Sequence, residues 1–196
     1  VQNHLSSYAT LENLPDKVAI QLNDTHPTLA IPEMMRILLD ECGFDWDKAF
    51  SICQKVFSYT NHTVMAEALE KWNVDIFKMT LPRIYQIVVE MDRRAREELA
   101  KAFPGDQGKI DYMALIGDNQ VRMANICAYT ANSINGVSKL HSEIIKESVF
   151  HDYYLFKPQA FKNVTNGIAY RRWLLASNPE LCKLLDETIG DGYKHD

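Results

Sequence analysis

The stretch KVAIQLNDTHPTLAIPEMMRILLDECG, residues 17–43, decides the fold class of the chain. It opens with a short, continuous apolar run over residues 17–22, which is typical of a strand buried on both faces. Polar residues end this run, and apolar residues with helical spacing follow Pro27. Gly43 is placed to end that helix in the left-handed conformation. We therefore predict a strand followed by a helix, as in units with parallel strands.

The rest of the chain continues this alternation. Asp45 is placed to cap a second helix, whose apolar residues recur at three and four residues up to Phe57. The clearest helix follows Pro82, and a cluster of three arginines lies off its apolar stripe, on a face that we expect to be solvated. The other expected elements are a short helix ending near Trp72, a strand over 121–130, a helix over 138–148, an aromatic connection over 150–156 and a helix over 181–190. This pattern predicts an α/β chain that is helix-rich.

Composition excludes several classes of protein. A chain of 196 residues with 46% hydrophobic residues can fill a core. With 26 acidic and 21 basic residues, its net charge of -5 offers no general attraction to nucleic acid or to an anionic membrane. The four cysteines form no C-x-x-C pair, which favours reduced thiols. No stretch approaches the roughly 20 apolar residues of a membrane span, and no signal peptide is recognisable. We therefore expect a cytoplasmic protein.

Asp24 and His26 lie between the predicted strand and the predicted helix. Such a pair can bind zinc or another divalent ion, but it needs further ligands, and His62 lies in no recognised metal-binding frame. Alternatively, Asp24 and Thr25 can cap the helix by accepting hydrogen bonds from its first amides. A third possibility follows from position, because ligands bind at the carboxyl ends of strands in open α/β sheets.

Two further polar clusters have the same setting. Residues 59–63, YTNHT, follow an apolar run, and each of these side chains could either serve a ligand or satisfy the backbone of a turn. Residues 165–167, TNG, are followed by Arg171, Arg172 and Trp173. His141 shares its helix face with isoleucines, so we interpret it as a core histidine with satisfied hydrogen bonds. Without G-x-S-x-G, Walker or G-x-G-x-x-G motifs, these residues alone predict a ligand-binding protein of unknown chemistry.

Five segments occur in a fixed order along the chain. They are KVAIQLNDTHPTLAIPEMMRILLDE, YTNHTVMAEALEKW, AFPGD, INGVSKLHSEIIK and TNGIAYRRWLL. Together they resemble the α-glucan phosphorylases of glycogen, starch and maltodextrin from about Leu14 to the C-terminus. The resemblance implies part of a two-domain, Rossmann-like fold of the GT-B type. It places residues 1–165 in the last portion of the N-terminal domain and residues 166–196 at the start of a truncated C-terminal domain.

The resemblance also implies an activity for the parent enzyme. Such enzymes transfer the terminal α-1,4-linked glucosyl unit of a glucan to orthophosphate and release glucose 1-phosphate. Their cofactor is pyridoxal 5′-phosphate, whose phosphate takes part in proton transfer. The lysine that carries the cofactor and the residues that bind the substrate phosphate lie downstream in the family, so we expect this segment alone to be inactive. We expect the parent enzyme to be a homodimer.

Site residues carry over from the family position by position. The main-chain carbonyl of His62 contacts the glucosyl unit, and the side-chain amide of Asn166 contacts its outer hydroxyls. Asp24 and His26 line the pocket beside the sugar, with Thr63 close by, and Trp173 approaches the cofactor. No catalytic residue in the strict sense and no metal ligand is expected in this segment.

Two alternatives from other classes stay open. One is a non-catalytic glucan-binding module that keeps half of the fold. The other is a metal-dependent hydrolase that uses Asp24, His26 and His62 as ligands.

Overall fold

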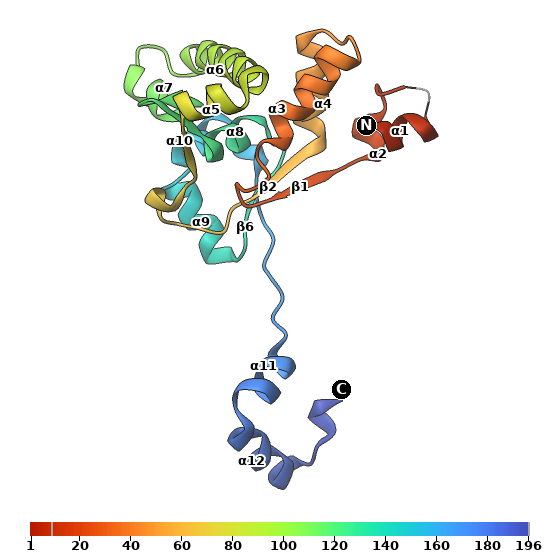
Figure 1. Ribbon diagram of the computed structural model, residues 1–196. Coiled ribbons are helices and arrows are strands. Elements are labelled where there is room, and N and C mark those ends of the chain that lie inside the picture. The colour runs from red at the N-terminus through yellow and green to blue at the C-terminus, as the bar shows by residue number, and fades with distance from the viewer. Residues whose placement is uncertain (9, 196) are drawn as a thin grey trace. The chain divides into compact units, whose positions relative to one another are not determined.

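A computed structural model describes residues 1–8 and 10–195 of the chain (Figure 1). The chain divides into two compact units, Val1–Val164 and Thr165–Asp196. Among the described residues, the first unit contains two sheets and most of the helices, and the second contains two α-helices and a short 3₁₀ helix.

A sheet of four parallel strands forms the centre of the first unit. In order across the sheet, the strands are β1 (Ile20–Asn23), β2 (Phe57–Thr60), β6 (Ile134–Gly136) and β7 (Phe161–Asn163). Leu22 pairs in register with Tyr59, and Tyr59 pairs with Ile134. All three side chains are buried. Strands β1 and β2 lie side by side in Figure 1. The α/β class with a parallel sheet is therefore confirmed.

The first strand is shorter and less buried than the sequence predicted. It begins at Ile20, because Leu14–Lys17 forms the short helix α2 with Pro15 in its first turn. Of its four residues only Leu22 is buried. Among the described strands β1 pairs with β2 alone, so it forms an edge of the sheet. The prediction of a strand buried on both faces was wrong.

Two helix-boundary predictions were confirmed. Gly43 has a φ of 70°, the left-handed value that glycine adopts most easily. The carboxylate of Asp45 accepts a hydrogen bond from the amide of Lys48 at 2.8 Å and caps the next helix. The helices on either side are α3 (Ala30–Arg36), continued by the π-helix η1 (Ile37–Glu41), and α4 (Trp46–Val56).

Helix α6, Pro82–Ala102, matches the clearest sequence pattern. Its apolar stripe is buried in the core, as predicted, through Ile84, Val88, Met91, Ala95 and Leu99. The arginines off this stripe form ion pairs with acidic neighbours, and Arg93 is about half exposed. The prediction of a solvated face was therefore confirmed for Arg93, whereas Arg94 and Arg96 are partly buried.

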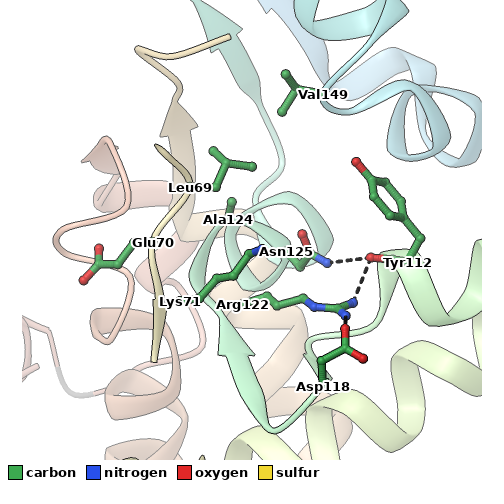
Figure 2. Close-up of a pocket in the computed structure, with 9 residues that line it drawn as sticks. All are labelled: Leu69, Glu70, Lys71, Tyr112, Asp118, Arg122, Ala124, Asn125 and Val149. Carbon is green, nitrogen blue, oxygen red and sulfur yellow. Dashed lines mark hydrogen bonds and ion pairs between the residues drawn. The ribbon is translucent and has the colours of Figure 1, made fainter. Parts of the chain in front are cut away.

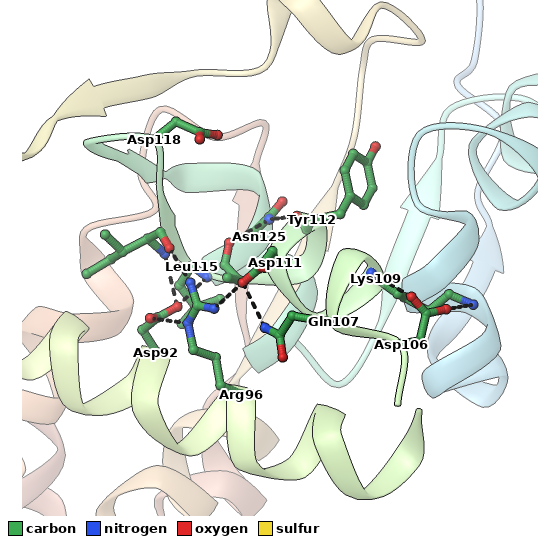
Figure 3. A network of polar contacts seen from close by, with 12 residues as sticks. Asp92, Arg96, Asp106, Gln107, Lys109, Asp111, Tyr112, Leu115, Asp118 and Asn125 are labelled. Atoms are coloured by element: carbon green, nitrogen blue, oxygen red, sulfur yellow. Dashed lines mark hydrogen bonds and ion pairs between the residues drawn. The ribbon is translucent and has the colours of Figure 1, made fainter. Parts of the chain in front are cut away.

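One face of α6 fastens a hairpin through Asp92 and Arg96 (Figure 3). The Asp92 Oδ1 atom accepts hydrogen bonds from the amides of Leu115 at 2.7 Å and Ile116 at 3.0 Å. Its Oδ2 atom accepts from Arg96 Nε at 2.8 Å, and Arg96 also donates to the carbonyl of Ile116 and to Asp111. These bonds hold the start of strand β4 against the helix.

The hairpin belongs to a small antiparallel sheet. Three predictions of local structure were wrong, two in or directly after this sheet and one further along the chain. This sheet consists of β3 (Lys71–Asn73), β5 (Gln120–Arg122) and β4 (Ile116–Gly117). A strand therefore contains Trp72, where a helix was predicted, and the expected strand over 121–130 is mostly helix α8 (Met123–Thr130). Seven of its eight residues are buried, so its sequence lacks a polar face that would reveal helical periodicity. The aromatic connection contains helix α10 (His151–Phe156).

The remaining α-helices frame these sheets and form the second unit. They are α1 (Gln2–Ser7), α5 (Val74–Thr80), α7 (Gln107–Met113) and α9 (Lys139–Glu147), with α11 (Tyr170–Ser177) and α12 (Pro179–Ile189) in the second unit. Short 3₁₀ helices are η2 (Ala66–Ala68), η3 (Pro158–Ala160) and η4 (Gly192–Lys194). Across residues 1–8 and 10–195, none of the helices combines the length and apolar character needed to cross a bilayer. All four cysteines are free thiols.

Candidate functional site

Two of the three predicted polar clusters lie at the carboxyl ends of parallel strands, whereas residues 165–167 belong to the second unit. Asp24 comes directly after β1, and residues 61–63 come directly after β2. Strand β6 ends at Gly136, and Val137 and Ser138 lead from there into helix α9. Because these strands are adjacent and parallel, the three loops meet at one edge of the sheet (Figure 1). The sheet therefore brings together polar residues that are more than 100 positions apart in the sequence.

Asp24 has a backbone conformation that few residues other than glycine adopt. Its φ is 69°, and its amide donates to the carbonyl of Thr60 at 2.9 Å. Its Oδ1 atom accepts from the amide of Thr25 at 2.6 Å. The Oδ2 atom lies 3.9 Å from Nε2 of His26, whose side chain is 82% exposed. The carboxylate is thus held by its own loop, while the imidazole faces solvent.

The predicted capping of the following helix was wrong. Helix α3 begins only at Ala30 and no side chain caps it. Thr25 instead donates its hydroxyl to Glu70 at 3.0 Å, and its carbonyl accepts from the hydroxyl of Thr28 at 2.6 Å. Residues 25–28 form a turn of their own, which separates Asp24 from the first helical amides. The loop therefore links β1 to Glu70 rather than capping α3.

His62 and Thr63 lie in the loop after β2. The His62 ring is exposed, and its Nε2 atom lies 2.5 Å from Oδ1 of Asn23. Thr63 is half-buried, and its amide donates to Oδ1 of Asn61 at 3.1 Å. The end of β2 is also joined to β6, since the Thr60 hydroxyl donates to Asn135 Oδ1 at 2.9 Å. Side-chain bonds therefore connect all three strand ends.

His141 was predicted to be a satisfied core histidine, and this was confirmed. It is only 9% exposed, and its ring contacts Asn61, Thr63 and the amide of Val137. Sequence reasoning had not identified its partner Asn61, which is fully buried. The only available signal was its place in the cluster YTNHT, where an amide side chain follows an apolar run.

The geometry does not support the metal-dependent alternative. His62 bonds to Asn23 rather than to Asp24, and His26 points its exposed ring into solvent. Within the described part of the chain, no group of three or more histidine, cysteine or acidic side chains could hold a metal ion. Asp24, His26 and His62 therefore do not form the ligand set that such a hydrolase needs.

A pocket of about 270 Å³ is lined in part by Glu70, the residue that accepts a hydrogen bond from the hydroxyl of Thr25 (Figure 2). Its charged lining includes Lys71, Arg122 and Asp118, and Arg122 donates to Asp118 at 2.7 Å and to the carbonyl of Tyr112 at 3.1 Å. Glu70 itself accepts from Trp72 Nε1 at 2.8 Å. The polar groups of this pocket are largely engaged with one another, so no single ligand chemistry follows from them.

Asn166 and Trp173 belong to the second unit. Asn166 is exposed in the segment before helix α11, and the Trp173 side chain on that helix is 63% exposed. Arg171 donates from Nε to the carbonyl of Tyr193 at 2.9 Å, which ties α11 to the last 3₁₀ helix. Both predicted residues therefore present their side chains at the surface of this unit.

Comparison with known proteins gives a consistent result. The sequence profile described as carbohydrate phosphorylase matches residues 1–196. The chain is 50% identical over 188 residues to the brain form of glycogen phosphorylase from Rattus norvegicus, covering 94% of this chain and 22% of that protein. It is 48% identical over 185 residues to the muscle form from Oryctolagus cuniculus, covering 93% and 22%. It is 46% identical over 191 residues to glycogen phosphorylase from Bacillus subtilis, covering 97% and 24%. The chain thus spans less than a quarter of the length of these relatives.

Proposed function

The chain belongs to the carbohydrate phosphorylase family, and we propose that it is a segment of an α-glucan phosphorylase. In this reaction the bond between C1 of the terminal glucosyl unit and the bridging oxygen breaks, and a phosphate oxygen bonds to C1. The bridging oxygen leaves as the 4-hydroxyl of the shortened glucan and takes up a proton. The observation that carries the proposal is the edge where the loops after β1, β2 and β6 meet, joined by hydrogen bonds in a chain of this family.

We propose that this edge forms one wall of the glucosyl subsite. The main-chain carbonyl of His62 accepts a hydrogen bond from the sugar, and Thr63 lies beside it. Asp24 and His26 line the pocket next to the sugar. The fixed backbone of Asp24 and the bond between His62 and Asn23 support these roles, because a site built on held groups loses little entropy when it binds.

The second unit supplies the other proposed contacts. The exposed amide of Asn166 can both donate to and accept from sugar hydroxyls. The exposed indole of Trp173 offers an apolar face that fits beside the ring of an aromatic cofactor. We propose that this cofactor is pyridoxal 5′-phosphate, whose phosphate supplies proton transfer when it is bound.

The division of the chain supports a proposed domain assignment. We assign residues 1–165 to the last portion of the N-terminal domain of the parent enzyme and residues 166–196 to the start of its C-terminal domain. Along the chain, the first compact unit ends at Val164 and the second begins at Thr165, within one residue of this proposed boundary. We further propose that the parent enzyme is a homodimer that acts in the cytoplasm, where its free thiols stay reduced.

The direct test is an assay of the full-length enzyme with an α-1,4-glucan and orthophosphate. We expect glucose 1-phosphate to appear only when the glucan, the phosphate and the cofactor are all present. Glucan binding without glucose 1-phosphate release by the cofactor-loaded enzyme would instead establish the non-catalytic glucan-binding module. Glycogen, starch and maltodextrin should be compared as substrates in the same assay.

A further inference from the structure

His141 occupies the first turn of helix α9, between the loop after β2 and the loop after β6. Its amide donates to the Ser138 hydroxyl at 3.1 Å, which caps the helix and fixes the start of α9. The imidazole is buried and faces both the loop after β6 and the loop after β2. The side chain therefore contacts two segments that carry the proposed sugar site.

The hydrogen bonds of His141 determine which ring nitrogen carries the proton. The amide of Val137 donates to Nδ1 at 3.0 Å, and an amide nitrogen cannot accept, so Nδ1 must present its lone pair. In the neutral ring the proton then lies on Nε2. This nitrogen is 3.1 Å from Oδ1 of Asn61 and 3.3 Å from the carbonyl of Thr63, and both of these oxygens accept. All polar atoms of the imidazole are satisfied in this tautomer.

Asn61 links the ring of His141 to the peptide bond between His62 and Thr63. Its Oδ1 atom accepts from both His141 Nε2 and the Thr63 amide, and its Nδ2 atom donates to the Tyr59 hydroxyl at 3.1 Å. The orientation of the Asn61 amide is thus fixed by the donors around it. In a trans peptide the N–H and C=O groups point in opposite directions, and this chain contains no cis peptide among its described residues. Because the Thr63 N–H points toward Asn61, the His62 carbonyl points away from it.

We propose that His141 is a positioning residue of the glucosyl subsite, which orients the His62 carbonyl through Asn61 and anchors the Val137 amide. The proposal rests on the proposed function, because the His62 carbonyl is the assigned sugar contact. The loop after β2 has no regular secondary structure over residues 61–65, so these side-chain bonds replace a ladder of backbone bonds. A loop held from both sides of His62 presents its carbonyl in one direction before the sugar arrives.

Two conservative variants separate the bonds of Nε2, to Asn61 and Thr63, from the bond of Nδ1, to Val137. Glutamine extends its amide nitrogen to about the place of Nε2, so His141→Gln keeps a donor for Asn61 and Thr63. Asparagine places its carbonyl oxygen near the place of Nδ1, so His141→Asn keeps an acceptor for Val137 only. His141→Ala removes both. Ile145→Val, one turn further along the same helix and fully buried, controls for a loss of core packing that leaves the site untouched.

The experiment measures kcat and KM for glucan and phosphate on full-length wild-type enzyme and these four variants, with a thermal melt of each. We expect kcat/KM for the glucan to fall about tenfold or more in His141→Ala and His141→Asn, and to recover to within about threefold of wild type in His141→Gln. Ile145→Val should lower the melting temperature without changing kcat/KM. Equal losses in the Gln and Asn variants, or an Ala variant within about twofold of wild type, would overturn the proposal. A cofactor-loaded wild type that releases no glucose 1-phosphate would instead overturn the proposed function.

Discussion

The amide of Asp24 donates to the carbonyl of Thr60 at 2.9 Å and so continues the pairing of β1 with β2 by one residue. Asp24 has a φ of 69°, a region in which most side chains clash with their own backbone. Its carboxylate offsets part of this cost by accepting from the Thr25 amide at 2.6 Å.

Substitutions at Asp24 should therefore rank by their tolerance of the left-handed region. Asp24→Ala loses the bond to Thr25 and keeps the strain, so we expect the full-length enzyme to lose about 1–2 kcal/mol of stability. Asp24→Asn tolerates this backbone and keeps an acceptor, so its stability should stay within about 0.5 kcal/mol of wild type. Thermal melts of both variants test this order. Equal melting temperatures would show that the backbone of Asp24 is not strained.

Gly136 should not accept even a methyl group. A Cβ atom there would lie 2.8 Å from the backbone nitrogen of Ser142 and 2.9 Å from its Cα atom, and the backbone of α9 would have to move. We expect Gly136→Ala to cost about 1–3 kcal/mol through overpacking and to lower activity, because the displaced helix carries His141. Melting temperature and kcat/KM of the full-length variant are the measurements.

Gly108 provides a matched control for this substitution. It lies in helix α7, and a Cβ atom there would meet its nearest neighbour, Asp106 Oδ1, at an ordinary 3.8 Å. Gly108→Ala should be neutral or stabilising by up to about 1 kcal/mol, since alanine favours the helix. If both variants lose stability equally, close approach is not the reason that position 136 requires glycine.

Glu90 should make stability depend on pH in the acid range. Hydrogen bonds from Arg93 and then Arg94 lower the pKa of its carboxyl from 4.5 to about 2. Because the pKa is lower in the folded state, the stabilisation is complete above about pH 4.5 and is lost as the pH falls toward 2. Glu90→Gln should thus melt below wild type at pH 7, and the difference should shrink steadily below pH 4.5. A difference that stays constant down to pH 2.5 would contradict this origin, and added salt should reduce it at pH 7.

The parts of the fold that the sequence predicted are those set by local, one-sided burial. Helix α6 could be predicted because its buried residues recur every three or four positions, and Asp45 because a cap acts within three residues. Helix α8 was missed because nearly all of its residues are buried, which leaves no contrast between its faces. Local patterns therefore identify amphipathic elements and fail for elements enclosed by the core.

The candidate site was predicted as a set of residues but not as a network. Asp24 and His62 stand out because polar residues follow apolar runs at the ends of expected strands. The long-range bonds of their neighbours Thr25 and Asn61 could not be predicted, since Thr25 bonds to Glu70 across 45 positions and Asn61 bonds to His141 across 80. Such pairings depend on the order of strands in the sheet, which one sequence without relatives does not reveal. The prediction that Thr25 caps α3 was wrong for the same reason, because the Thr25 hydroxyl bonds to Glu70, which is distant in the sequence.

The isolated 196-residue chain should be inactive and prone to self-association. Its second unit exposes large apolar side chains on α11 and α12, among them Trp173, Leu184 and Ile189. Several large apolar side chains exposed on one small unit favour association in water. We expect no glucose 1-phosphate from this chain with glycogen and phosphate, and broad, concentration-dependent sedimentation. Borohydride reduction after incubation with pyridoxal phosphate should label no single lysine stoichiometrically. Measurable turnover, or a monomer with one sharp melt, would contradict the prediction.

The most informative substitution in the full-length enzyme is Asn166→Ala. Asn166 is exposed in its unit and precedes α11, so removing its amide should leave the stability of the fold nearly unchanged. In the proposed sugar site this change should leave a sugar hydroxyl without a partner, at a cost of about 1–3 kcal/mol, or roughly tenfold to a hundredfold in kcat/KM. The matched comparison is His62→Ala, which keeps the main-chain carbonyl assigned to the sugar and loses only the ring contact with Asn23. Its loss of kcat/KM should therefore be smaller. Steady-state kinetics and thermal melts of both variants test this ranking. An Asn166→Ala enzyme with unchanged kcat/KM would show that Asn166 is only a turn residue. A larger loss of kcat/KM in His62→Ala than in Asn166→Ala would assign the imidazole a direct role.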